Sequence, residues 1–225
     1  MKEMVIAEVD SLTRQEAVAS LMPSVVELMA QAGWQKSELN CIVVGEGPGS
    51  FTGVRTGVVT ARSIAQGLQL PLIPVHLLDC YASVCHLPAA VVLAAGRGRY
   101  FAAGYLSKNS SDCFEMSAPP TSVSTEDLGA LLAESPVWYL DGKAQTELSE
   151  KLESLTGPQG GPSPELRSLP ILENIATKQA QIAWNRVSLN DSFVQAYPYQ
   201  SVTPLYLRSP SITMKKIASE KPHGS

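Results

Sequence analysis

The chain has 225 residues, a formal net charge of −4 and 44% hydrophobic residues, which is enough for one large domain or two smaller lobes with an ample core. Its Lys and Arg residues form no basic run, which argues against a protein that binds nucleic acid alone by neutralising phosphates. The sequence shows no signal-peptide pattern and no apolar run long enough to cross a membrane, so we expect a cytoplasmic protein.

The first long predicted element is a helix from Thr13 to Ala32, preceded by a possible strand at Met4–Val9. Apolar residues recur on one side of this helix at Ala17, Leu21, Val25, Leu28 and Ala32. Met22, Val26 and Met29 make the apolar stripe wider than one buried face requires. Two interpretations stay open: a helix deep in its own core, or a helix with a second surface for a partner, which Met side chains would suit.

A strand, a glycine loop and a helix follow one another between Cys41 and Leu68. Cys41–Val44 is a short, β-branched apolar run, as expected of a buried strand. The next six residues, Gly45–Ser50, are rich in Gly and Pro and predict a loop. Ser50 or Thr52 can cap a helix that continues to about Leu68, because Pro71 prevents its extension.

The glycine loop does not have the sequence of a phosphate-binding loop. Gly53 is followed by Val54 and Arg55, where a P-loop requires Lys and then Ser or Thr. A dinucleotide-binding fingerprint that starts at Gly45 or Gly47 lacks its third glycine. We therefore expect no nucleotide cofactor at this loop.

The helix after the loop carries small residues every four positions, at Gly53, Gly57, Ala61 and Ala65, with Val54 and Val58 beside them. Each glycine costs about 1 kcal/mol of helix propensity relative to alanine, so close contact with another backbone is the expected compensation. The strip could pack on the chain's own sheet or meet a helix of another subunit. Arg55, in the first turn, could pair with Glu46 or bind a carboxylate or phosphate of a partner.

The rest of the chain alternates strands and helices in two blocks, which predicts an α/β fold. The expected elements are a strand at Pro71–Val75, a helix at Leu77–Cys85, a hairpin of Ala89–Ala95 and Tyr100–Leu106, a polar loop at Ser107–Pro120, a helix at Thr125–Ala133, a strand at Val137–Leu140, an irregular connection at Thr156–Pro170, a helix at Glu173–Val187 and an extended segment at Val202–Arg208. The histidines have no metal-ligand spacing and the cysteines form no CxxC pair, so we expect reduced thiols and no metal.

The run GPGSFTGVRTG at Gly47–Gly57, followed by the small-residue helix and by Pro71–Val75, closely resembles the TsaB (YeaZ) family. Supporting matches are Leu21–Ser24, Arg97–Phe101 and Pro204–Arg208. The resemblance spans most of the chain, and the glycine motif is its specific part. It implies the two-lobed actin-like or Hsp70-like ATPase (ASKHA) fold, with an N-terminal lobe at residues 1–88, a C-terminal lobe at 89–207 and a disordered tail at 208–225.

The resemblance also raises a question about the start of the chain. Family members begin with an additional hairpin whose first strand carries a short Asp-Thr-Ser-like turn, and nothing here matches it. We therefore expect the first hairpin to be missing. Either the start codon was placed downstream of the true one, or the missing strand leaves an exposed sheet edge.

The family is the non-catalytic subunit of the bacterial machinery that makes threonylcarbamoyladenosine beside the tRNA anticodon. The resemblance implies a scaffold subunit that binds a catalytic TsaD-like paralogue and a TsaE-like ATPase, forms a homodimer when alone and touches tRNA only indirectly. The interface residues implied by resemblance and pattern are Leu21, Met22, Val25, Met29, Gly49, Ser50, Phe51, Thr52, Gly53, Val54, Arg55, Gly57, Val58, Ala61 and Ala65. The alternatives are a small-molecule kinase or ATPase of the same fold, a protease, or a binding module with an unrelated client.

Overall fold

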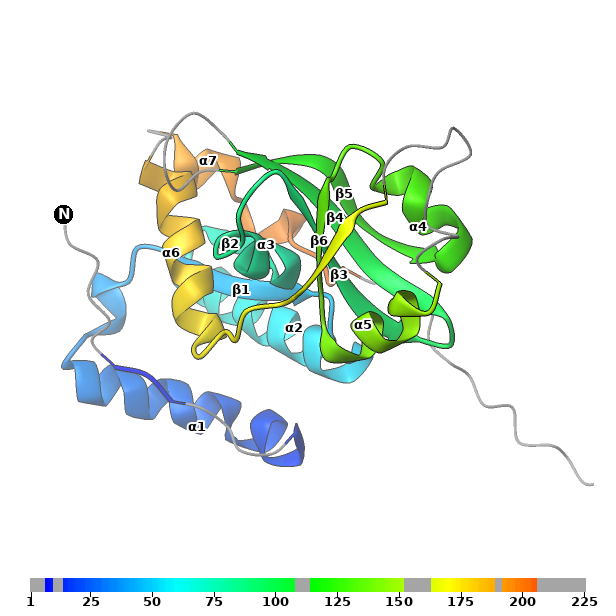
Figure 1. Cartoon of the computed structure of the whole chain (residues 1–225). Coiled ribbons are helices and arrows are strands. Elements are labelled where there is room, and N and C mark those ends of the chain that lie inside the picture. The colour runs from blue at the N-terminus through cyan, green and yellow to red at the C-terminus, as the bar shows by residue number, and fades with distance from the viewer. Residues whose placement is uncertain (1–6, 10–13, 108–113, 152–162, 189–191, 206–225) are drawn as a thin grey trace, which may run out of the picture.

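The computed structural model describes residues 7–9, 14–107, 114–151, 163–188 and 192–205, and it contains two β-sheets flanked by helices (Figure 1). The first block consists of α1 (Arg14–Ala32), a 3₁₀ turn η1 (Lys36–Glu38), β1 (Ile42–Gly47), α2 (Phe51–Leu68), β2 (Leu72–His76) and α3 (Leu77–Ala82). The helices expected at Thr13–Ala32 and up to Leu68 are therefore confirmed, as is the strand before the glycine loop.

The first sheet consists of β1 and β2, which pair in parallel with Ile42 opposite Leu72 and Val43 opposite Ile73. Helix α2 connects them and packs on the sheet. Its residues Val58, Ala61 and Ala65 form a core cluster with Val44, Leu72 and Val202. No strand precedes β1 among the described residues, and Ala7–Val9, the described part of the strand expected at Met4–Val9, lies outside regular secondary structure.

The second sheet has the strand order β5-β4-β3-β6-β7. Its strands are β3 (Ala89–Gly96), β4 (Arg99–Ser107), β5 (Phe114–Ser124), β6 (Val137–Leu140) and β7 (Glu165–Ser168). The hairpin of β3 and β4 and the strand β6 are as expected. Helices α4 (Thr125–Leu131) and α5 (Gly142–Ser149) cover one face, where Trp138, Leu128 and Leu148 are buried in the same core cluster.

Two expectations for this second block were wrong. The segment Ser107–Pro120 was expected to be a loop, yet residues from Phe114 onward form β5 along the edge of the sheet. The connection Thr156–Pro170 was expected to be irregular, yet it contains the edge strand β7. Both strands have one neighbour only, so their side chains are largely polar and the sequence carries little hydrophobic alternation to reveal them.

Helix α6 (Ile175–Ser188) follows the second sheet in the chain but packs against the first. Its residues Ile182 and Ala183 join Ile73 and Val75 in one core cluster. Arg186 donates one hydrogen bond to the Pro74 carbonyl oxygen at 2.9 Å and another to the Asp79 carboxylate at 2.6 Å. The boundary at residue 88 stays a prediction, and the tail expected at 208–225 lies outside the described residues.

The described chain ends with α7 (Phe193–Ala196), a 3₁₀ turn η3 (Tyr199–Ser201) and residues up to Leu205. This last segment returns to the first sheet, where the Leu205 amide donates a hydrogen bond to the Glu46 carbonyl oxygen at 3.0 Å. Among the described residues, no helix combines the length and the hydropathy that a membrane span needs.

Candidate partner-binding surface

Helices α1 and α2 lie side by side at one border of the molecule, and α2 is the element that α1 contacts most (Figure 1). The pair exposes several large apolar side chains. Val26 is 64% exposed and Met22 46% on α1, while Val59 is 52% exposed and Phe51 40% on α2. Isolated exposed apolar residues are common, but four of them on two adjacent helices indicate a surface that suits a protein partner.

The small-residue strip of α2 has two different environments. Val58 and Ala65 are fully buried and Ala61 is nearly so, because these residues face the chain's own core. Gly57, one turn before Ala61, is half-buried, and a Cβ built on it would meet no atom of the described residues within 4 Å. The strip therefore packs on the sheet along its second half, whereas Gly57 faces open space.

The remaining predicted residues lie on α1, in the glycine loop and in the first turns of α2. On α1, Met22 is exposed, and Leu21, Val25 and Met29 are half-buried. In the loop and the first turns of α2, the exposed residues are Gly49, Ser50, Phe51, Thr52, Gly53 and Arg55, and Val54 is half-buried. The structure adds Val26 and Val59, which the prediction did not include in the surface. Val26 belongs to the wide apolar stripe of α1, which alone does not show that it is exposed. Val59 lies outside the small-residue strip, and Ser63, four residues later, gives it no apolar neighbour in the sequence pattern.

The glycine loop is joined to α2 by a helix cap. The Ser50 side-chain oxygen accepts a hydrogen bond from the Gly53 amide at 3.1 Å, and the Ser50 carbonyl oxygen accepts one from the Val54 amide at 2.9 Å. A Cβ on Gly53 would lie 2.7 Å from the Ser50 hydroxyl oxygen, so glycine at this position protects the cap. The cap uses one of the amides that an anion at the helix start would need.

Arg55 and Glu46, which could have paired locally, have different surroundings. Arg55 is exposed on α2 and has no ion-pair partner in the described part of the chain. Glu46 instead lies beside His76, with a distance of 3.4 Å between its Oε1 and the imidazole Nδ1. The Arg55 guanidinium is therefore available to a carboxylate of a partner, next to the apolar residues of the surface.

The groups that could support catalysis are few in the described residues. Burial raises the pKa of the Cys80 and Cys85 thiols to about 12, and it also raises the pKa of Cys41, so little thiolate forms at neutral pH. No group of three His, Cys, Asp or Glu residues in the described ranges could hold a metal. The Asp141 carboxylate accepts hydrogen bonds from the Ala144 and Ala94 amides, so it occupies the turn between β6 and α5.

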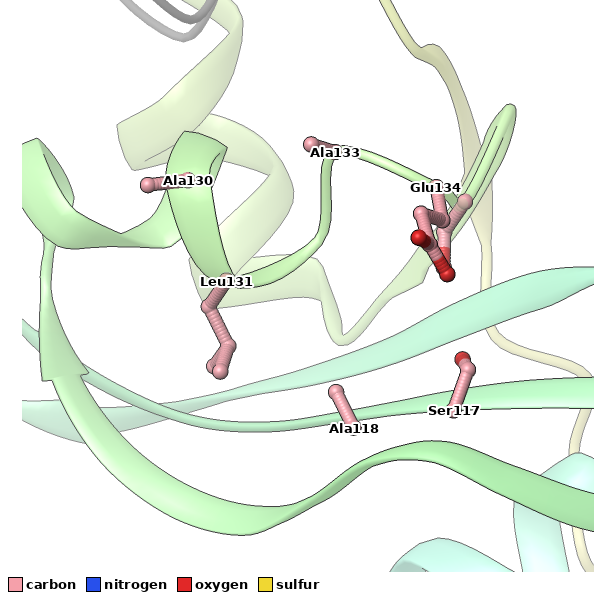
Figure 2. Close-up of a pocket in the computed structure, with 7 residues that line it drawn as sticks. Ser117, Ala118, Ala130, Leu131, Ala133 and Glu134 are labelled. Atoms are coloured by element: carbon pink, nitrogen blue, oxygen red, sulfur yellow. The ribbon is translucent and has the colours of Figure 1, made fainter.

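A hollow of about 270 Å³ lies away from this surface, between β5 and the end of α4 (Figure 2). Figure 2 shows Leu131 and Glu134 on one side and Ser117 and Ala118 of β5 on the other. Its lining residues are Ser117, Ala118, Ala130, Leu131, Ala133, Glu134 and Ser135. The only charged group in this lining is a carboxylate, so the hollow does not suit a nucleotide phosphate.

Known proteins resemble this chain in sequence over most of its length. Residues 9–123 match the family model described as TsaD, tRNA N6-adenosine threonylcarbamoyltransferase. The tRNA threonylcarbamoyladenosine biosynthesis protein TsaB of Bacillus subtilis is 30% identical over 164 residues, which cover 71% of this chain and 70% of that protein. The protein of the same name from Escherichia coli K12 is 37% identical over 67 residues, 30% of this chain and 29% of that protein.

Solved structures agree with the sequence relatives on the fold. YeaZ from Pseudomonas aeruginosa superimposes with a TM-score of 0.60 at 22% identity, over 85% of each chain. A second crystal structure, of a protein with similarity to peptidase YEAZ from Pseudomonas aeruginosa, gives a TM-score of 0.58 at 22% identity, over 84% of this chain and 83% of the other. These likenesses, with the family match and the mixed five-stranded sheet, confirm the expected α/β fold of the actin-like ATPase type.

Proposed function

The chain belongs to the TsaB (YeaZ) family, and on that premise we propose that it is a scaffold subunit, without catalysis of its own, in the biosynthesis of tRNA threonylcarbamoyladenosine. Relatives carry that process in their names, and the matched family model is named for the transferase of the same modification. The role in this biosynthesis follows from the family. The scaffold role is our proposal.

The partner we propose is a TsaD-like catalytic subunit, which shares its family model with residues 9–123 of this chain. Two chains of related fold can pair through equivalent helices in a pseudo-two-fold arrangement. The same surface on two identical copies would be self-complementary, so we propose a homodimer when the partner is absent. A TsaE-like ATPase would join the assembly. Contact with tRNA would come through the catalytic subunit, because this chain has a formal net charge of −4.

The observation that carries the proposal is the open space beside Gly57. A glycine inside a helix lowers stability by about 1 kcal/mol relative to alanine, and no neighbour among the described residues requires its small size. A backbone that approaches from outside would require it. The exposed apolar residues Met22, Val26, Phe51 and Val59 of the same two helices add apolar area that a partner would bury.

The test is the substitution Gly57→Leu, measured by size-exclusion chromatography with light scattering and by calorimetry with the TsaD-like protein of the same organism. We expect the free variant to fold at least as stably as the wild type, because a Cβ at residue 57 meets no described atom within 4 Å and leucine has a higher helix propensity than glycine. Binding should weaken by about a hundredfold, the effect of a few kcal/mol of overpacking at a close contact.

Gly67→Leu is the matched control. Gly67 lies in the last turn of α2 and is exposed, and a Cβ added to it would also meet no atom within 4 Å, so this variant should bind normally. If Gly57→Leu binds as tightly as the wild type, the proposed surface is wrong. If the wild type does not bind the TsaD-like protein at all, the scaffold role itself is wrong.

A further inference from the structure

A second feature of the glycine loop is a pair of ionisable side chains at its base. Glu46 and His76 stand at the carboxyl ends of the parallel strands β1 and β2, where the strand register places Gly47 opposite His76. Their side chains are only 15% and 18% exposed, and 3.4 Å separates Glu46 Oε1 from His76 Nδ1. The imidazole Nδ1 is buried and makes no hydrogen bond within the described residues, so its contact with the carboxylate is electrostatic.

The other charged groups around this pair are already matched to one another. Asp79 of α3 is fully buried, and its carboxylate accepts hydrogen bonds from the Tyr105 hydroxyl of β4 at 2.8 Å and from Arg186 of α6 at 2.6 Å. Cys80 of α3 and Lys178 of α6 also interact electrostatically within this cluster. Arg186 is paired with Asp79, and a protonated His76 would offset the charge of Glu46 across 3.4 Å.

Glu46 is also the residue at which the loop leaves the sheet. Its carbonyl oxygen accepts the hydrogen bond from the Leu205 amide, and the next residue, Gly47, has a positive φ of 116° that favours glycine. After Gly47 and Pro48 the chain reaches Ser50, which caps α2. Glu46 is therefore only four residues from Ser50, so a displacement of Glu46 would move the residue that caps α2 at the start of the proposed partner surface.

We propose that Glu46 is a proton-sensitive positioning residue beneath the glycine loop: ionised, it loosens the loop, and a positive charge on the neighbouring His76 opposes this loosening. A carboxylate loses hydration when it is buried, so the closed loop favours a proton on Glu46 or a positive charge beside it. Opening of the loop returns the carboxylate to water. The consequence for partner binding rests on the proposed function, whereas the loosening itself is a property of the free chain.

The electrostatic surroundings agree with this geometry. Burial raises the pKa of Glu46, and the charges of His76 and then Arg186 act in the opposite direction. By linkage, a group with a higher pKa in the closed state than in the open state favours closure at low pH, and this contribution is lost as the pH rises through the closed-state value. The loop should therefore loosen as the pH rises.

The test is hydrogen exchange of the Gly53 and Val54 amides in the free full-length chain, corrected for the intrinsic effect of pH. These amides report the cap, because both are bonded to Ser50. We expect Glu46→Gln to slow exchange at neutral pH and to reduce its dependence on pH, since glutamine imitates the protonated acid. His76→Gln should accelerate exchange, by about tenfold for each unit by which the Glu46 pKa rises further.

If Glu46 and His76 had a purely structural role, both Glu46→Gln and His76→Gln would loosen the loop and accelerate exchange. The proposal instead predicts slower exchange in Glu46→Gln and faster exchange in His76→Gln. Glu115→Gln and His86→Gln, at exposed positions, are the matched controls and should leave exchange unchanged. Faster exchange in both Glu46→Gln and His76→Gln, or no change in either, would overturn the proposal.

The same variants are then titrated with the TsaD-like protein between about pH 4 and 8. Binding should weaken in His76→Gln and become less dependent on pH in Glu46→Gln. If exchange behaves as expected but binding does not follow it, Glu46 does not position the partner surface. If the wild type fails to bind, the proposed function is wrong, and the exchange data still decide whether Glu46 loosens the loop.

Discussion

The two helices of the proposed surface are held in the protein by different means. Helix α2 has Val58 and Ala65 fully buried against the first sheet and a serine cap at its start. Helix α1 has no fully buried side chain between residues 19 and 32, and its apolar stripe is half-buried at best. The position of α2 is therefore set by the chain's own core, whereas α1 retains apolar area that a partner could cover.

The small-residue strip of α2 can therefore pack on the chain's own sheet at one end and remain open to a partner at the other. Ala61 and Ala65 are small because the sheet lies close to them, and Gly57 has no such neighbour. Substitutions on the core side of the surface should then act on folding, and substitutions on its outer side should act on binding. The predictions below test this separation.

The largest effect is expected at the core side of α2. Ala65→Asp places an unpaired carboxylate at a position with 0% exposure, which should lower the free energy of unfolding by about 3–5 kcal/mol. Gly67→Asp, two residues further and exposed, should change stability little. Urea denaturation followed by circular dichroism measures both variants, and equal stability of the two would show that α2 is not anchored as described.

The next effect is expected on α1 and should appear in binding. The double substitution Met22→Ser and Val26→Ser removes two exposed apolar side chains, so the free energy of unfolding should stay within about 1 kcal/mol of the wild type. Affinity for the TsaD-like protein should fall by roughly 30- to 100-fold if each side chain contributes over 1 kcal/mol. Loss of folding instead of binding would mean that α1 is part of the core.

Local sequence signals predicted the first block well because each of its elements has its own marker. The β-branched run before Gly45, the capping serine and the proline at residue 71 mark the strand and the limits of α2, and the structure has all three features. The stripe of α1 predicted its helix equally well. The edge strands β5 and β7 lack such markers, since a strand with one neighbour and a polar outer side has little hydrophobic alternation.

The sequence indicates which helices carry the candidate surface, but not which of their residues are exposed. A period of four residues indicates that one side of α2 is small, yet it does not say where the sheet ends beneath that side. Ala61 and Ala65 therefore turned out to be core residues, and Gly57 did not. The contact between Glu46 and His76 joins residues 30 positions apart, and it depends on the register of β1 with β2, which no local pattern specifies.

A smaller effect is expected at the joint between the loop and α2. Ser50→Ala removes the oxygen that accepts the Gly53 amide, which should lower the free energy of unfolding by about 1 kcal/mol. Ser50→Asp keeps an acceptor and should keep most of the stability. The two variants are compared in urea at pH 7. If they are equally stable, the cap contributes nothing to the position of α2.

The smallest effect is a change in how global stability depends on pH. Because burial raises the pKa of Glu46 above its unfolded value of about 4.3, its contribution to stability is present below that value and lost as the pH rises through the folded one. Glu46→Gln cannot ionise, so its stability relative to the wild type should increase as the pH is raised from about 4 to 8. Urea midpoints at several pH values measure this trend, with Glu115→Gln, on an exposed side chain, as the control. A constant difference across that range would mean that the Glu46 carboxylate is solvated in the folded protein, and the loop would then owe its position to the Leu205 and Ser50 contacts alone.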